Sequence, residues 1–330
     1  MGEWRASPSV SVLTPTWNRA AYLQKVWEGL AAQAYRNFEW IVANDGSEDN
    51  TIEVVYELAA KSDFPVTLIN ASCRIGKSRM DNEAVRIARG EFIIWCDSDD
   101  FFFPQALQTL VDAWASIPAA EREQFCSISA LCDTDEEVLG NPFYPKDKTI
   151  DLSWNELFYR LNSDLVIFTR AELLKENPFL EVDFLVSESS VWNKIGIRKT
   201  RFLPIVLERK YYRQPNALSH SGHMSYNRGH AHAMALSREA AAKLLNRKES
   251  LRRAINYLRY CRHGEIPLDK ALKLWRAEWR DVALFALVWP LSETLAAKDR
   301  LQGKVRKTHK EFLAAQAVVK IETERLNFSA

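Results

Sequence analysis

The sequence predicts an α/β fold in which a parallel sheet is flanked by helices. Through residues 10–114, short apolar segments alternate strictly with segments of helical periodicity. This is the pattern of parallel strands joined by crossover helices. Polar clusters follow the apolar segments, as expected where strands end at a ligand-binding edge. From about residue 236 the pattern is almost wholly helical, which predicts a helical C-terminal extension.

The alternation defines four strands and four helices. The strands are expected at residues 10–13, 38–45, 66–71 and 91–97, and the helices at 20–32, 51–60, 78–89 and 104–114. Gly90 stands where a helix C-cap is expected, and Pro104 suits the first turn of a helix. Residues 115–235 mix shorter strand and helix patterns. We therefore divide the chain into residues 1–115, 116–235 and 236–330, with the first two as halves of one domain.

The bulk composition is that of a soluble globular protein and gives no reason to expect a nucleic-acid partner. The chain has 330 residues and a net charge of +1, which is long enough for a sizeable core. Residues 1–234 hold 24 Lys and Arg against 32 Asp and Glu, whereas residues 235–330 hold 20 against 11. The basic C-terminal region is either a solvated helical surface or a surface that faces something anionic.

Several sequence features favour a cytoplasmic location. The first residues lack the apolar core of a secretory signal. The most apolar run, residues 282–291, is shorter than the roughly 20 residues of a membrane-spanning helix. Five cysteines without a C-x-x-C pair are typical of buried thiols in a reducing compartment.

The segment Asp97-Ser98-Asp99-Asp100 sets three carboxylates directly after an apolar strand. Two carboxylates two residues apart on a turn can both approach Mg2+ or Mn2+. These ions take few oxygen ligands from the protein and the remainder from water and substrate phosphates. The alternative is a polar loop, because D-x-D is a short motif that also arises by chance.

Two further polar clusters end the first and second strands. The carboxylate of Asp45 can accept a hydrogen bond from a base imide such as that of uracil, although Asp-Gly is equally a turn dipeptide. Trp17 offers a large π-face for a nucleobase, or it belongs to the core, as most of the eleven tryptophans must.

After the third strand, basic residues flank a glycine, which suits diphosphate contact or a solvated helix start. They are Arg74, Lys77 and Arg79.

Four ordered motifs make the first 110 or so residues resemble the nucleotide-sugar-binding half of a family 2 glycosyltransferase, which has the GT-A fold. They are VLTPTWNRAAYL, QAYRNFEWIVANDGSEDNT, RIGKSRMDNEAVRIARGEFI and CDSDDFFFP. The resemblance implies an inverting, metal-dependent transfer of a sugar from a nucleotide-sugar donor, with Mn2+ or Mg2+ as cofactor. A UDP-sugar is the expected donor, and a bacterial surface polysaccharide or glycolipid is the expected product.

The same resemblance assigns the site residues. Asp45 would read the base, and Asp97 and Asp99 would bind the metal. The remaining nucleotide contacts would come from Thr14, Pro15, Thr16, Trp17, Arg19, Arg74, Lys77, Arg79 and Ser98. Two departures stand out. Asn44 replaces the first Asp of a common Asp-Asp-Gly-Ser motif, and Asp81-Asn82 stands where relatives often have Arg-Asn.

The acceptor half should supply a general base that deprotonates the acceptor hydroxyl. By resemblance, Glu188 in FLVSESSVWNKIG is that base, although many relatives have Glu-Asp where this chain has Glu188-Ser189. The alternative is a helix-capping or solvated role, with Asp183 and Glu181 as fallback bases.

A histidine-rich run follows the acceptor half. By resemblance, His220 and His223 would help to hold the metal or the diphosphate. A zinc site is disfavoured because no cysteine lies nearby. A lid that closes over the donor and keeps water out is the favoured interpretation of this run.

Apolar residues recur at helical spacing in the C-terminal region. They are Leu268, Leu272, Trp275, Trp279, Val282 and Leu287. Such a stripe is usually core or oligomer contact, while basic residues beside it would also suit an anionic membrane surface. The expected acceptor is a saccharide or a lipid-linked saccharide. Peripheral contact with the inner face of the membrane and a homo-oligomer therefore both stay open.

Two other functions fit the same fold class. A nucleotidyltransferase uses a related sheet, but it usually carries a glycine-rich basic loop after its first strand, and TPTWNRAAYL has no glycine. A non-catalytic partner subunit is favoured by Ser189 and disfavoured by the intact Asp45, Asp97 and Asp99. A dehydrogenase is disfavoured, since no G-x-G-x-x-G follows the first strand.

Overall fold

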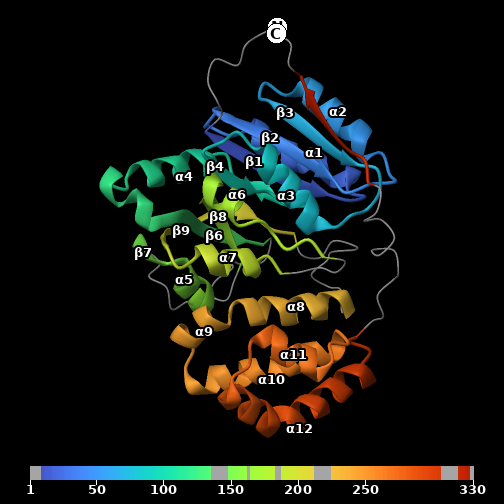
Figure 1. Ribbon diagram of the computed structural model, residues 1–330. Helices are drawn as coiled ribbons and strands as arrows, with labels where there is room; N and C mark the ends of the chain where they lie inside the picture. The colour runs from blue at the N-terminus through green and yellow to red at the C-terminus, as the bar shows by residue number, and fades with distance from the viewer. Residues whose placement is uncertain are drawn as a thin grey trace. The chain divides into compact units, whose positions relative to one another are not determined.

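A computed structural model (Figure 1) describes residues 9–134, 148–161, 164–182, 187–211, 224–305 and 319–327. The chain forms two compact units. Unit 1 comprises residues 1–178, 195–214 and 315–330, and unit 2 comprises residues 179–194 and 215–314. The units interleave along the chain, because residues 195–214 and 315–330 return to unit 1.

Unit 1 is built on a mixed sheet of ten strands within the described ranges. The strands are β1 (Val10–Thr16), β2 (Phe38–Asn44), β3 (Val66–Ala71), β4 (Phe92–Trp95), β5 (Phe101–Phe102), β6 (Phe125–Asp133), β7 (Ile150–Ser153), β8 (Leu165–Arg170), β9 (Lys199–Arg209) and β10 (Ile321–Leu326). Their order is β10-β3-β2-β1-β4-β8-β6-β9-β5, and β7 pairs with β9 outside this path.

The N-terminal half of unit 1 confirms the predicted alternation. Strands β1 to β4 run parallel in the order β3-β2-β1-β4. They are joined by α1 (Ala20–Ala31), α2 (Thr51–Lys61) and α3 (Lys77–Ile87), and α4 (Ala106–Ala115) follows. Because crossovers are right-handed and the strand order reverses at β1, α1 and α2 lie on one face of the sheet and α3 lies on the other. The reversal makes a switch point at the carboxyl ends of β1 and β4, where ligands bind in such sheets.

The apolar pattern explains why these elements form. All seven residues of β2 are buried, as expected of a central strand that is covered on both faces. Helix α1 buries Leu23, Val26 and Leu30 at helical spacing and presents them to the sheet. These side chains and the inward-facing strand residues belong to one continuous core.

Two local predictions were wrong. Helix α3 ends with Ala88 as its C-cap, so Gly90 is not a cap. A side chain at Gly90 would place its Cβ 2.5 Å from the backbone nitrogen of Ser11, and the glycine is therefore needed for close approach to β1. Residues 321–326, within the region predicted as helical, form β10 and pair antiparallel with β3.

In the C-terminal half of the sheet the strands are no longer all parallel. Strand β8 runs antiparallel to β4 and to β6, and β9 runs parallel to β6. The carboxyl ends of β6 and β9 therefore reach the same sheet edge as the ends of β1 to β4. The short helices of this half are η1 (Ala119–Gln124), α5 (Trp154–Leu161) and α6 (Ala171–Glu176), and α6 packs against α3.

Unit 2 is helical in its described residues. It contains α8 (Met224–Leu236), α9 (Arg238–Leu244), α10 (Arg247–His263), α11 (Leu268–Trp275) and α12 (Trp279–Leu301). Helix α10 packs against both α8 and α12 (Figure 1). The rings of Tyr257, Trp275 and Phe285 contact one another in the core. Throughout the described ranges, every helix is too short or too polar to span a membrane.

Candidate active site

The D-x-D segment turns sharply at the carboxyl end of β4. The backbone N–H of Asp100 donates to the carbonyl of Asp97 at 2.9 Å, which closes the turn. Each carboxylate of the motif faces a cation. Arg19 lies 3.6 Å from Asp99, and Lys77 lies 3.9 Å from Asp97. Because Arg19 follows β1 and Lys77 opens α3, three elements meet at the switch point.

The two carboxylates differ in their electrostatic surroundings. Partial burial raises the pKa of Asp97, but the ammonium groups of Lys77 and Lys210 outweigh it and hold that pKa below its usual value. Burial raises the pKa of Asp99, although the Arg19 guanidinium opposes the shift. The pKa of Asp97 therefore lies below that of Asp99.

The residues at this turn fit a divalent cation. Two carboxylates on one turn supply the hard oxygen ligands that Mg2+ or Mn2+ takes, and each already attracts positive charge. Among the described residues no group of three or more His, Cys, Asp or Glu could hold a metal. A cation bound here would accordingly take its other ligands from water and substrate phosphates.

Asp45 is anchored at the carboxyl end of β2. Its carboxylate accepts hydrogen bonds from the backbone N–H of Ile75 at 2.6 Å and from that of Gly76 at 3.0 Å. Burial nevertheless raises the pKa of Asp45 to about 6. Gly46 allows this turn, because it has a φ of +66° and a Cβ there would lie 2.3 Å from the backbone of Cys73.

Trp17 lies beside the same segment. The Arg74 guanidinium carbon is 3.6 Å from the centre of the Trp17 ring, and the Arg74 Nε is 4.0 Å from the Asp45 carboxylate. A flat cation, an indole face and a carboxylate thus converge from three loops. This combination suits a planar heterocycle that stacks on a π-face and offers a hydrogen-bond donor.

The two threonine hydroxyl groups at the end of β1 differ in their hydrogen bonding. Thr14 is fully buried, donates to the Cys96 carbonyl at 2.8 Å and accepts from Trp40 Nε1 at 2.9 Å. This hydroxyl therefore has a structural role that joins three segments, and the contact of Thr14 with a nucleotide stays a prediction. The buried hydroxyl of Thr16 has no hydrogen-bond partner within the described residues. Such a group needs an explanation, and a ligand at the switch point would supply one. Pro15 is half-buried and Ser98 is buried beside them.

The two departures from the family motifs have structural explanations. Asp81 is buried and accepts from Lys77 Nζ at 3.0 Å and from Trp95 Nε1 at 3.0 Å. It thereby holds Lys77 toward Asp97. Asn44 donates to the Asn70 side chain at 2.8 Å, which joins the ends of β2 and β3. Arg79 is half-buried on α3 and makes no ion pair with any described residue.

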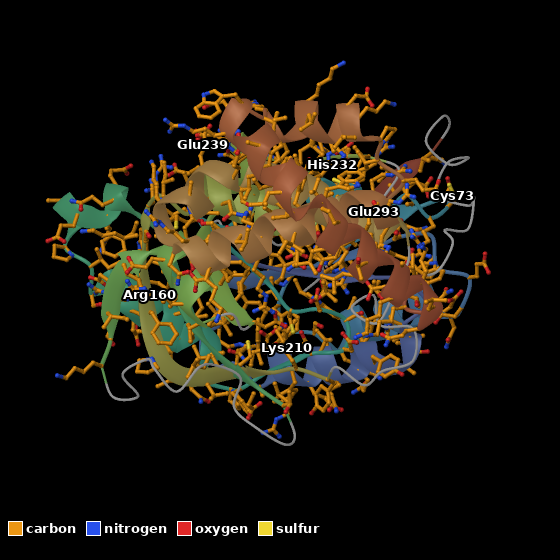
Figure 2. All side chains as sticks on the ribbon, turned by 90° about the horizontal axis from the view of Figure 1, so that it is seen from below. Cys73, Arg160, Lys210, His232, Glu239 and Glu293 are labelled. Atoms are coloured by element: carbon orange, nitrogen blue, oxygen red, sulfur yellow. The ribbon has the colours of Figure 1, made fainter. Side chains whose placement is uncertain are left out.

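A buried charge cluster, which no sequence pattern predicted, lies behind the D-x-D turn. Lys210 (labelled in Figure 2) lies 2.7 Å from Asp100 and 3.6 Å from Glu208. Burial lowers the pKa of Lys210, but Glu208 and Asp100 outweigh it and raise that pKa well above its usual value. Burial raises the pKa of Asp100 to about 6, against the opposing charge of Lys210. In the sequence, the signal for this charge cluster was Glu208, an acidic residue inside an apolar strand.

Glu188 directly precedes α7 (Ser189–Ile195). Its carbonyl accepts from the backbone N–H of Val191 at 2.9 Å, so Glu188 occupies the start of a short helix, as the resemblance implied. Glu188 and Glu181 belong to unit 2. Asp183, His220 and His223 lie outside the described residues, and their assigned roles stay predictions.

Known proteins resemble this chain most clearly in the half that carries the site. Residues 11–120 match the family model described as Glycosyl transferase family 2. A GalNAc(5)-diNAcBac-PP-undecaprenol beta-1,3-glucosyltransferase of Campylobacter jejuni is 26% identical over 59% of this chain and 62% of its own length. Glycosyltransferase GlyG of Streptococcus pneumoniae is 27% identical over 54% of this chain and 60% of its own length. The chain thus spans less than two thirds of both relatives.

Solved structures share the fold. The crystal structure of S. aureus TarS matches 90% of this chain and 54% of its own with a TM-score of 0.57 and 20% identity. TarS 1–349 in complex with UDP-GlcNAc matches 90% of this chain and 84% of its own with a TM-score of 0.55 and 20% identity. These matches support the predicted sheet flanked by helices with a helical C-terminal region.

Proposed function

We propose that this chain, whose residues 11–120 match the model of glycosyltransferase family 2, transfers a sugar from a UDP-sugar to a hydroxyl group. The acceptor is a saccharide or a lipid-linked saccharide, and the anomeric carbon is inverted. The main support is the alternation of charge at the switch point, where Arg19 faces Asp99 and Lys77 faces Asp97. Such an array offers cations to a diphosphate and carboxylates to a divalent ion.

Each residue has a defined task in this proposal. Asp45 accepts the imide N–H of the base, which stacks on the Trp17–Arg74 pair. Arg19 and Lys77 donate to diphosphate oxygens. When bound at Asp97 and Asp99, Mg2+ or Mn2+ neutralises charge on the leaving diphosphate. Glu188 takes the proton from the acceptor hydroxyl as that oxygen attacks the sugar.

The relatives support the choice of donor and acceptor. TarS 1–349 has been solved in complex with UDP-GlcNAc, which supports a uridine donor. The Campylobacter jejuni relative is named for an undecaprenol-linked substrate, which supports a lipid-linked acceptor and glycan biosynthesis. We place the reaction in the cytoplasm, with the inner face of the membrane as the source of a lipid-linked acceptor.

The donor site is tested by calorimetric titration of UDP and GDP with and without Mn2+. Wild type should bind UDP in the presence of Mn2+, and Asp99→Asn should weaken that binding at least about tenfold, or about 1.4 kcal/mol. Asp63→Asn is the matched control, because Asp63 is an exposed acid of unit 1 that pairs with Arg36. Absence of UDP and GDP binding under every condition would contradict the proposal and favour a non-catalytic partner subunit.

The pH dependence of UDP binding tests Asp45. Its native pKa is about 6, so the carboxyl is mostly protonated below that pH and mostly ionised above it. A carboxylate accepts the imide N–H better than a carboxylic acid does, so affinity should rise about tenfold between about pH 5 and about pH 7. Asp45→Asn should lack this rise. Since the phosphates of UDP titrate identically in both proteins, the difference between the two profiles isolates Asp45. Parallel profiles would remove Asp45 from base recognition.

A further inference from the structure

Helix α12 is apolar on two opposite faces. Its inner face buries Phe285 and Val288 against the rest of unit 2. Its outer face exposes Trp279 by 74% and Leu287 by 76%. Val282 and Leu291 are exposed as well, and residues 282–292 include no charged residue. A helix that is apolar all round is normally covered on all sides, so this outer face indicates a binding partner.

The predicted stripe of the C-terminal region is therefore not one surface. Trp275 is buried in the core of unit 2, and Leu272 packs partly against it. Trp279, Val282 and Leu287 lie on the exposed side, and Leu268 is exposed on α11. The interpretation as core therefore holds for Trp275 and Leu272 only. The exposed residues of the stripe need another explanation.

Charge is sorted between the two faces of α12. Its three acids point into unit 2: Asp281 pairs with Arg238, Asp299 pairs with Arg259 and His263, and Glu293 (labelled in Figure 2) pairs with Arg262. Its three bases are Arg280, Lys298 and Arg300, all exposed. None of these bases joins an ion pair in the described part of the chain. Apart from the exposed N-cap acid Glu278, which lies 3.9 Å from Arg238, the charges bordering the apolar outer face are thus positive.

We propose that the outer face of α12 is a docking surface for an anionic lipid membrane. The helix lies in the membrane plane, with Trp279, Leu287 and Leu291 among the acyl chains and the three bases at the headgroups. Self-association through this face is disfavoured. In a two-fold contact the same surface meets itself, so a face whose bordering charges are mainly Arg280, Lys298 and Arg300 would repel its second copy.

Basic charge extends beyond α12. Residues 224–305 hold sixteen Lys and Arg against eight Asp and Glu, so unit 2 carries the positive excess of the chain in its described helices. Each base close to an anionic bilayer strengthens binding about fivefold at low salt. The combination of basic charge with exposed tryptophan and leucine therefore matches an anionic lipid surface better than a neutral one.

Cosedimentation with vesicles tests this surface. The full chain should bind phosphatidylglycerol vesicles and bind phosphatidylcholine vesicles at least about tenfold more weakly. Leu287→Glu should reduce phosphatidylglycerol binding at least about tenfold, because it places a carboxylate among acyl chains. Ile197→Glu is the control, since Ile197 in unit 1 is exposed by 73%, and it should bind like wild type. A variant with Arg280, Lys298 and Arg300 all changed to Glu should also lose binding.

Two outcomes would overturn the proposal. The first is phosphatidylglycerol binding that is absent in wild type or unchanged in Leu287→Glu. The second is a concentration-dependent dimer, seen by light scattering, that Leu287→Glu dissolves, because it would assign the face to a second copy of the chain. UDP titration of Leu287→Glu keeps this test separate from the proposed function: donor binding should equal that of wild type whether or not the membrane is bound.

Discussion

Lys210→Met is expected to destabilise unit 1 by about 3–5 kcal/mol, because it leaves buried acids without their counterion. Lys210 contacts Asp100 at 2.7 Å and Glu208 at 3.6 Å, and its side chain is only 14% exposed. Thermal unfolding monitored by circular dichroism should show a midpoint lowered by about 10 °C. UDP binding should weaken with it, since Asp100 belongs to the turn that carries Asp97 and Asp99.

The pH dependence and a double variant identify the cause. Without Lys210, the native pKa values of Asp100 and Glu208 rise further above their unfolded values. The variant should therefore lose stability as pH rises and recover part of it in acid. Adding Glu208→Gln should restore part of the stability at neutral pH, because one unpaired charge is removed. Lys61→Met, at an exposed lysine of α2, should change stability by less than about 0.5 kcal/mol. Wild-type stability in Lys210→Met would disprove the role of the cluster.

Glu188→Gln is expected to lower kcat by about 10²–10⁴-fold while leaving the affinity for UDP unchanged, because it removes the proposed general base without altering the proposed donor contacts. Release of UDP from UDP-GlcNAc, with water as acceptor, measures turnover without knowledge of the natural acceptor. The substitution keeps the size and hydrogen-bonding capacity of the side chain, so the start of α7 should stay folded.

Glu181→Gln is the matched control for the general base. Glu181 lies seven residues earlier in the same unit and is the fallback base, so the pair of variants decides between them. Loss of turnover in Glu181→Gln alone would move the role to Glu181. Wild-type turnover in both variants would contradict a glutamate base in this segment.

The N-terminal half of unit 1 could be predicted from sequence because its signals are local. Strands β1 to β4 are short apolar runs, and α1 to α3 have apolar residues at helical spacing. Parallel strands with right-handed crossovers leave few arrangements. The end of each strand then determines which residues share the sheet edge, and this brought Trp17, Asp45 and Asp97 to one place.

What the sequence could not determine depends on contacts between distant segments. Strand β10 is six residues long, with four consecutive polar residues between Ile321 and Leu326, and it forms only because β3 offers an open edge. Gly90 looked like a helix cap, but its role depends on how closely β1 approaches. Neither feature has a periodicity that a local pattern could reveal.

The sequence by itself determined the alternating strands and helices of the N-terminal half of unit 1, its motifs and the family that they resemble. Only the tertiary structure decided that Lys210, more than a hundred residues after Asp100, neutralises the acid behind the D-x-D turn. It also decided that the apolar pattern of the C-terminal region divides between a core and an exposed face of α12. The physical reason is the same in both cases. Periodicity reports that a side chain is apolar or charged, whereas burial and counterions depend on which distant segment the fold places against it.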